Sequence, residues 1–178
     1  TAMAIGYDWL YSSLSDQSRI TIRNAIINKG LNPSFDSNYN QWLNYNNNWD
    51  QVCHTSMTYG ALAIMESDST LAKKVIDRAI QAIPTFDNFY QPDGIYPEGY
   101  NYWEYGTTYN VLFLAALEKI PEYKGKITPS PNFLKTAGFY QNMSGLNTKC
   151  FNWADAGEDG FLTPAIFWFA KKNNDPSL

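Results

Sequence analysis

Three segments of the chain hold most of the side chains that could do chemistry. They are rich in aromatic, amide and carboxylate groups, and they are Asn44–His54, Asp93–Gly106 and Cys150–Gly160. The middle segment, DGIYPEGYNYWEYG, places four tyrosines, one tryptophan and two glutamates among three glycines and a proline. Aromatic faces beside amides and hydroxyls suit sugars, whose C–H faces stack on rings while their hydroxyls need donors and acceptors. These segments therefore favour a carbohydrate site, and we expect the middle one to be a loop rather than a helix or strand.

Carboxylates in these segments allow one kind of sugar chemistry. A glycoside hydrolase needs two suitably separated carboxyl groups, one acting as an acid and the other as a base or nucleophile. Glu98 could pair with Glu104, or with Asp50 of the preceding segment. Hydrolysis is therefore one function that the residue types permit.

Metal chemistry finds little support in the residue types. His54 is the only histidine, which nearly excludes a zinc site of the common His/Cys kinds. Asp155, Glu158 and Asp159 do not have the spacing of a calcium loop, so solvated loop acids are the better interpretation. We expect neither a metal nor a cofactor.

Several candidates also have a purely structural interpretation. Tyr100, Tyr102 and Tyr105 could pack over the ends of helices, and Asn46–Asn48 could form a turn with an N-cap. His54 falls inside an apolar helical pattern, where a hydrogen-bonded structural histidine is common. Structural and functional roles stay open for each of these residues.

The elements that must position these segments are helices of two alternating kinds. One kind is amphipathic. Its apolar positions in one helix are Ala72, Val75, Ile76, Ala79, Ile80 and Ile83, with charged residues on the opposite side. A second amphipathic helix is expected from a Ser15 N-cap to Lys29, with Gly30 as its stop.

The other kind is apolar or small nearly all round, which is typical of helices buried on every side. These segments are Ala2–Leu14, Val52–Met65, Tyr109–Leu117 and Leu162–Ala170, and a weaker helix is expected around Asn132–Met143. Alternating buried and amphipathic helices predict an all-α fold of antiparallel hairpins, an α/α toroid with inner and outer helices. The hairpins are fewer than a closed ring needs, so we expect a single domain over residues 1–178 that is part of a larger enzyme.

The three polar segments each precede an inner helix. Inner helices of such a toroid run parallel, so their preceding loops are expected to meet at one end and line one cleft. The residues that this places together are Asn46, Asn47, Asn48, Trp49, Asp50, His54, Glu98, Tyr102, Trp103, Glu104, Tyr105, Trp153 and Asp155.

The order of four segments resembles the toroid domain of heparinase II/III-like polysaccharide lyases. They are AIGYDWLYSSLSDQSRITIRNAI, NNWDQVCHTSMTYGALAI, DGIYPEGYNYWEYGTTYNVLFLAALE and FNWADAG. The resemblance implies β-elimination on a polysaccharide that contains uronic acid. An amide or imidazole neutralises the sugar carboxylate, a tyrosine removes the C5 proton, and a proton passes to the departing O4.

Residue roles follow from the same resemblance. The neutralising position matches Asn48, and the tyrosine position matches Tyr105, with Tyr102 as its alternative. Glu98 stands where some toroid lyases carry a histidine, and His54 remains a candidate. Asn47, Trp49, Asp50, Trp103, Glu104 and Trp153 are expected to bind substrate.

Composition limits the partners. The net charge of -4 gives no basic surface for nucleic acid, and no apolar run approaches the ~20 residues of a membrane span. The expected partner is an acidic polysaccharide or oligosaccharide, met in the periplasm or outside the cell because of its size. A glycan-binding or scaffold module without catalysis is the remaining alternative.

Overall fold

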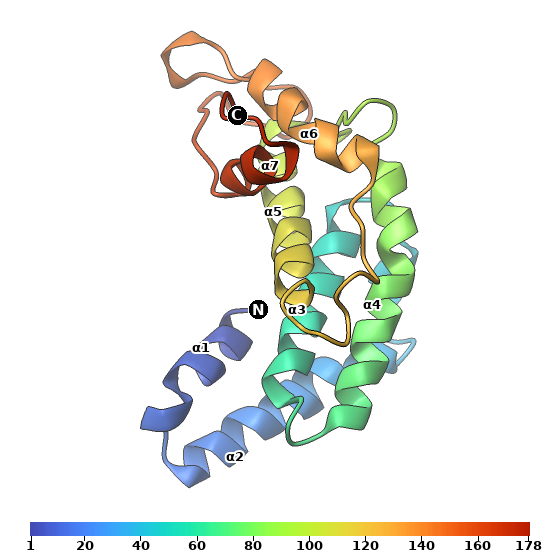
Figure 1. Ribbon diagram of the computed structural model, residues 1–178. Coiled ribbons are helices and arrows are strands. Elements are labelled where there is room, and N and C mark those ends of the chain that lie inside the picture. Colours follow the sequence, from blue (N-terminus) through green and yellow to red (C-terminus); the bar gives the residue numbers. More distant parts are fainter. The chain divides into compact units, whose positions relative to one another are not determined.

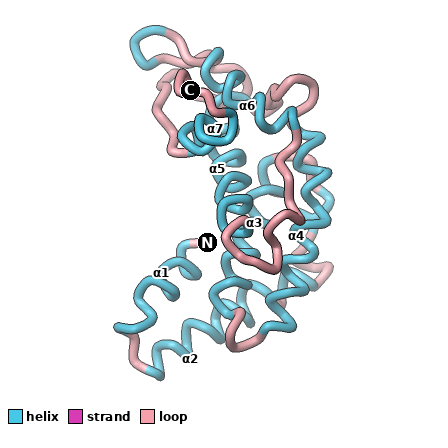
Figure 2. Tube along the Cα trace, in the orientation of Figure 1, coloured by secondary structure: helices cyan, strands magenta, loops and turns pink.

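The computed structural model describes residues 1–178, apart from the side chain of Ile83. Figures 1 and 2 show a chain built of helices and loops, and no strand occurs among the described residues. Two isolated β-bridges, Ser144 to Cys150 and Lys149 to Asp159, hold the long loop before the last helix. The expected all-α class is confirmed.

Seven α-helices make up most of the structure. They are α1 (Ala2–Leu10), α2 (Asp16–Ala25), α3 (Asn48–Ile64), α4 (Ser69–Phe89), α5 (Gly99–Leu117), α6 (Pro131–Asn142) and α7 (Ala165–Asn173). Short helical turns lie between them: η1 (Tyr11–Ser13), η2 (Ile26–Leu31), η3 (Pro33–Phe35), η4 (Gln41–Asn44) and η5 (Leu146–Thr148). No helix among the described residues combines the length and apolar character that crossing a bilayer requires.

Contacts divide the chain into two compact units. Unit 1 consists of residues 1–45 and 53–82, and unit 2 of residues 46–52 and 83–178. Helices α3 and α4 each have residues in both units. The segments predicted to carry the chemistry fall mainly in unit 2.

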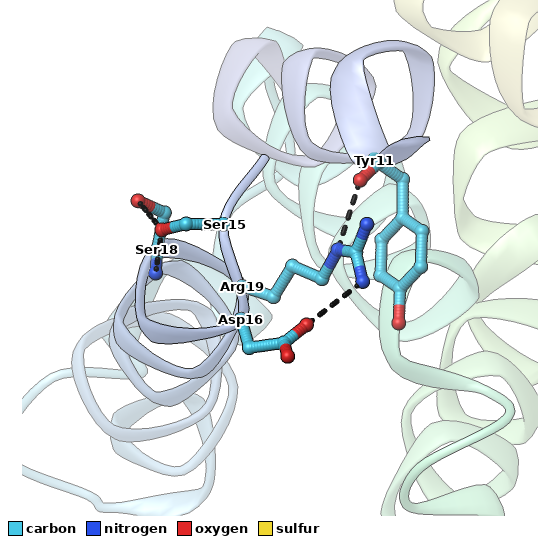
Figure 3. Close-up of polar contacts among 5 residues, drawn as sticks. All are labelled: Tyr11, Ser15, Asp16, Ser18 and Arg19. Carbon is cyan, nitrogen blue, oxygen red and sulfur yellow. Dashed lines mark hydrogen bonds and ion pairs between the residues drawn. The ribbon is translucent and has the colours of Figure 1, made fainter. Parts of the chain in front are cut away.

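In unit 1, the start of α2 is fixed by the predicted cap. Ser15 Oγ accepts a hydrogen bond from Ser18 N at 3.2 Å, which satisfies one of the free N–H groups of the first turn. Figure 3 shows this cap beside Arg19, which donates to Tyr11 O and pairs with Asp16 while its guanidinium lies over the Tyr11 ring. Arg19 thereby joins η1 to α2.

The predicted end of this helix is wrong. The chain does not stop at Gly30 but continues from α2 into a wider π-helical turn, η2, that ends at Leu31. Leu31 is buried and packs near Gly60, where an added Cβ would stand 3.1 Å from Leu31 Cδ2. Burial of Leu31 favours the extra turn, and Pro33, which has no N–H to continue it, begins the separate turn η3.

The amphipathic pattern of α4 is confirmed. Ala72, Val75, Ile76 and Ala79 are completely buried, and Ile80 is half-buried. Ile83, the last position of the pattern, has a side chain outside the described part of the structure. The helix also extends past Pro84 to Phe89.

Burial of α1 on every side is not observed. Only Ala4 and Tyr7 are buried, whereas Met3, Trp9 and Leu10 are more than half exposed. These exposures show that α1 buries one face only, and that α2 does not cover its other side.

In unit 2, the loop predicted over Asp93–Gly106 is only partly a loop. Helix α5 already begins at Gly99, which has a φ of 83°, a value that favours glycine. Tyr100, Trp103 and Thr107 are buried at helical spacing, so packing of this face decides the conformation despite the glycines.

An aromatic core joins α5, α6 and α7. The Tyr140 ring stacks on Tyr100 and on Trp103, with ring centroids 4.2 Å apart in each pair. Phe133 of α6 packs against Phe169 of α7 at 5.1 Å. The helices predicted around Asn132–Met143 and Leu162–Ala170 are therefore present, the second one shifted toward the C-terminus.

Candidate functional site

The site is built where α3 begins. Asn47 Oδ1 accepts a hydrogen bond from Trp49 N at 3.0 Å, which is the contact an N-cap residue makes. This leaves the amide NH2 of Asn47, a half-buried residue, available as a donor. The next residue, Asn48, is the first of the helix and is 3% exposed.

Glu98 binds the same helix start. Its carboxylate accepts from Asn48 N at 2.8 Å and from Asn48 Nδ2 at 3.0 and 3.2 Å. A carboxylate at a helix N-terminus is also favoured by the helix dipole. Glu98 stands just before α5 but does not cap it, so its side chain instead ties the start of α5 to α3. The prediction that these two segments meet is thus reflected in the contacts.

Gly106 allows α5 to approach α3 closely. A Cβ at this position would overlap Tyr96 Oη, stand 3.1 Å from Asn48 Cβ and stand 3.3 Å from Gln51 Oε1. Only glycine fits against these groups without a shift. Tyr105, directly before Gly106 in α5, therefore belongs to the helical turn that approaches α3.

A buried polar cluster lies behind this contact. Gln51 Oε1 accepts from Tyr90 Oη at 2.8 Å, and Tyr90 Oη lies 3.1 Å from Thr107 Oγ1. Burial raises the pKa of Tyr90, and burial, followed by the neighbouring Tyr90 and Glu98, raises the pKa of Tyr96. The negative charge of Glu98 acts on the Tyr96 hydroxyl, but this hydroxyl makes no hydrogen bond of normal geometry.

Some aromatic rings of these segments are exposed to solvent. Trp49 is 55% exposed, Tyr105 is 42% exposed and packs edge-to-face on Tyr109, and Tyr102 is half-buried. Of the two tyrosines, Tyr105 presents more of its surface to solvent. It is therefore the better placed to reach a substrate.

The third polar segment, Cys150–Gly160, contacts the first residues of α5. Trp153 O would lie 2.6 Å from a Cβ on Gly99, and Asn101 Oδ1 accepts from Gly157 N at 3.2 Å. The Trp153 ring itself is 42% exposed. Contacts thus run without a break from Trp153 through Gly99 and Glu98 to Asn48.

Three other candidates are buried or engaged by neighbouring side chains. Trp103 is completely buried and donates from Nε1 to Thr136 Oγ1 at 2.7 Å, so it presents no face to a substrate. Glu104 accepts from the hydroxyls of Thr108 and Thr163. Asp50 is buried in the first turn of α3.

His54 belongs to unit 1. It is buried and packs edge-to-face on Trp42, with ring centroids 4.9 Å apart. This placement agrees with the structural interpretation of the residue. The structure does not bring it together with Glu98 or Tyr105 in one unit.

Sequence reasoning missed the cluster of Gln51, Tyr90 and Tyr96. Gln51 lies in the polar segment Asn44–His54 but is not among its predicted site residues, Tyr90 lies beyond the amphipathic pattern that ends at Ile83, and Tyr96 looked like one more loop tyrosine. A glycine at position 106, inside a helix rich in large residues, was the one signal of a close approach.

Neither a comparison with protein-family models nor one with curated proteins finds a match for this chain.

Proposed function

We propose that this chain is the helical part of an enzyme that binds an acidic polysaccharide and cleaves it by β-elimination. The observation that carries the proposal is the unbroken set of contacts in unit 2 from Trp153 through Gly99 and Glu98 to the start of α3, because the three segments that it joins also contain the exposed rings of Trp49, Tyr105 and Trp153. Exposed rings beside amide donors are the surface that a sugar chain requires. We also propose the α/α toroid, supported by the succession of amphipathic α4 and enclosed α5.

Tyr105 is the proposed base. As the phenolate it takes the proton from C5, the C4–C5 double bond forms, the C4–O4 bond breaks, and the phenol returns the proton to O4. A free tyrosine has a pKa of about 10, so ionisation needs donors at the oxygen. The substrate carboxylate must be neutralised for C5 to become acidic.

The amide that neutralises the carboxylate is Asn47 in this geometry. The Asn48 side-chain nitrogen donates to the Glu98 carboxylate and the residue is 3% exposed, so Asn48 is poorly placed to act on substrate. Asn47 uses its oxygen as a cap and keeps its NH2 group for a ligand. Asn48 then serves to hold the start of α3 in place.

Hydrolysis is less well supported by the same contacts. Both oxygens of Glu98 are occupied by N–H donors of Asn48, and Glu104 is held by two threonine hydroxyls. A carboxylate committed to donors is poorly placed to give a proton to a leaving group. A glycan-binding surface without catalysis remains the second candidate, because exposed rings alone suffice for it.

The reaction class is tested by product analysis. The chain is incubated with hyaluronan, chondroitin, heparan and alginate, and the absorbance of unsaturated uronate is followed together with new reducing ends. Elimination raises both signals in parallel for at least one polymer. Reducing ends without the absorbance would establish hydrolysis, and saturable binding without either signal would establish the binding module.

The role of Asn47 has a sharper test. Asn47→Asp keeps an oxygen for the N-cap but removes the NH2 donor and adds a negative charge, so turnover should fall at least about tenfold while the thermal midpoint stays within a few degrees. Asn47→Ser is the matched control for the cap. Equal activity of Asn47→Asp and the wild type would exclude this residue as the neutralising group.

A further inference from the structure

A cavity lies in unit 1, and none of the residues of the proposed catalytic site lines it. It has a volume of about 420 Å³ and is lined by Lys29, Ser34, Tyr39, Trp42 and Met57, among others. This size lies within the range of cavities that hold small ligands. All of its lining residues belong to unit 1, so the cavity is complete within that unit.

The guanidinium of Arg78 lies behind the cavity wall that contains Ser34, and it has no anionic partner there. Arg78 donates to Ser34 O at 2.7 Å and to Ser34 Oγ at 2.9 Å, and both of these acceptors are neutral. Its guanidinium lies over the Phe35 ring at 4.3 Å and near the Trp42 ring at 5.4 Å. Burial lowers the pKa of Arg78, as expected for a cation without an anionic partner.

Two lysines add to this charge. Lys74 Nζ lies over the same Phe35 ring at 4.2 Å, and Lys29 stands at the cavity itself. Among the described residues, no carboxylate forms an ion pair with Lys29, Lys74 or Arg78. Asp36, near Lys29 in sequence, accepts instead from the backbone and side-chain nitrogens of Asn38. Asp77, next to Arg78 in sequence, forms no ion pair with these cations among the described residues.

Flat apolar surface accompanies the charge. Trp42 is buried in the wall and held by the edge contact with His54, while Tyr39 is 66% exposed at the rim. Rings of this kind accept the C–H face of a sugar. Lys29 is the charged residue in the lining of the same cavity, whereas Ser34 Oγ is engaged by Leu31 O and Arg78.

We propose that this cavity binds an anionic sugar residue, a uronate, with its ring against Tyr39 and Trp42 and its carboxylate at Lys29. Arg78 does not touch the ligand but contributes positive potential through the Ser34 wall. The site is distinct from the proposed catalytic site, and its existence does not depend on turnover there.

The test is a titration of the whole chain followed by amide and indole chemical shifts in NMR. A hyaluronan hexasaccharide is the probe, chitohexaose is its neutral counterpart, and inorganic phosphate represents a bare anion. The proposal predicts shift changes at the Gly30 amide and the Trp42 indole with the hyaluronan hexasaccharide and none with chitohexaose. Lys29→Gln and Tyr39→Ala should each weaken this binding about fivefold or more, whereas Lys171→Gln, the same charge change on α7, should leave it unchanged.

Each contrary result overturns a stated part of the proposal. Equal binding of chitohexaose rejects recognition of the charge, and equal binding by Lys29→Gln rejects the lysine contact. Phosphate binding of the same strength, insensitive to Tyr39→Ala, rejects the sugar assignment in favour of a simple anion site. Tyr105→Phe should not alter these shifts, so failure of the catalytic proposal and failure of this one are distinguishable.

Discussion

Glu98 and Gly106 determine how the candidate site is assembled at the residue scale. Glu98 supplies the acceptor for three hydrogen bonds from Asn48, and Gly106 supplies the space in which Asn48, Gln51 and Tyr96 meet. Both lie in the sequence segment that first indicated chemistry. Their structural role explains part of the polar character of that segment without any substrate.

Gly106→Ala should destabilise the chain by about 1–3 kcal/mol, because the new Cβ overlaps Tyr96 Oη and crowds Asn48. The free energy of unfolding from urea denaturation measures this change. Gly138→Ala on α6 is the matched control, since nothing lies within 4 Å of its added Cβ. That variant should be unchanged or more stable by up to about 1 kcal/mol, and equal stability of both variants would contradict the close approach of α5.

Capping and packing compete to set the helix boundaries at the element scale. The apolar face of α4 and the cap of α2 were predictable because both depend on local spacing. The start of α5 was not, because its glycines oppose a helix locally and only burial of Tyr100 and Trp103 favours one. The π-helical turn through Gly30 was hidden for the same reason, since it depends on the burial of Leu31.

The candidate site, like the helix boundaries, was predictable from the sequence only in part. The meeting of the Asn47 and Glu98 segments followed from helix order, but the inward turn of Asn48 toward Glu98 did not. A single sequence shows which groups are polar and gives no direction for their side chains. The burial of Trp103 was missed because an aromatic residue in a polar segment looks the same whether it faces a ligand or the core.

Ser15→Ala should lower the free energy of unfolding of α2 and its neighbours by about 1 kcal/mol, because the Ser18 N–H loses its acceptor. Ser18→Ala is the control, as it removes a hydroxyl from the same turn but leaves that N–H bonded to Ser15. It should change stability by less than about 0.5 kcal/mol. A larger loss in Ser18→Ala than in Ser15→Ala would show that the cap does not stabilise the helix start.

Charge is distributed unevenly between the two units of the whole molecule. Unit 1 contains six lysines and arginines and six aspartates and glutamates, so the net charge of -4 belongs to unit 2. Unit 2 also contains the buried tyrosines 90 and 96. The charges of unit 1 therefore cancel although the whole chain is acidic, and binding of an anionic ligand at the unit 1 cavity remains favourable.

Alkaline pH should destabilise unit 2. The pKa values of Tyr90 and Tyr96 are raised in the folded chain, so above about pH 10 the unfolded chain loses phenol protons that the folded chain retains. Stability is then complete below that pH and falls above it by up to about 1.4 kcal/mol per pH unit for each tyrosine. Urea midpoints measured from about pH 8 to about pH 11 follow the loss.

Tyr90→Phe isolates one contribution to this pH dependence. It should lower stability at about pH 8, because Gln51 loses its donor, but it should flatten the decline at higher pH. Tyr39→Phe, at an exposed position, should alter neither value. An unchanged alkaline slope in Tyr90→Phe would contradict the burial of that hydroxyl.

The most direct test of the account is the rate of unsaturated uronate formation by Tyr105→Phe, on whichever acidic polysaccharide the wild type cleaves. The variant loses only the hydroxyl and keeps the exposed ring and its packing on Tyr109. The account predicts that turnover falls by at least about a hundredfold while binding of the polymer changes little. Activity that survives this substitution would contradict the assignment of Tyr105 as the base, and with it the elimination site proposed at the start of α3.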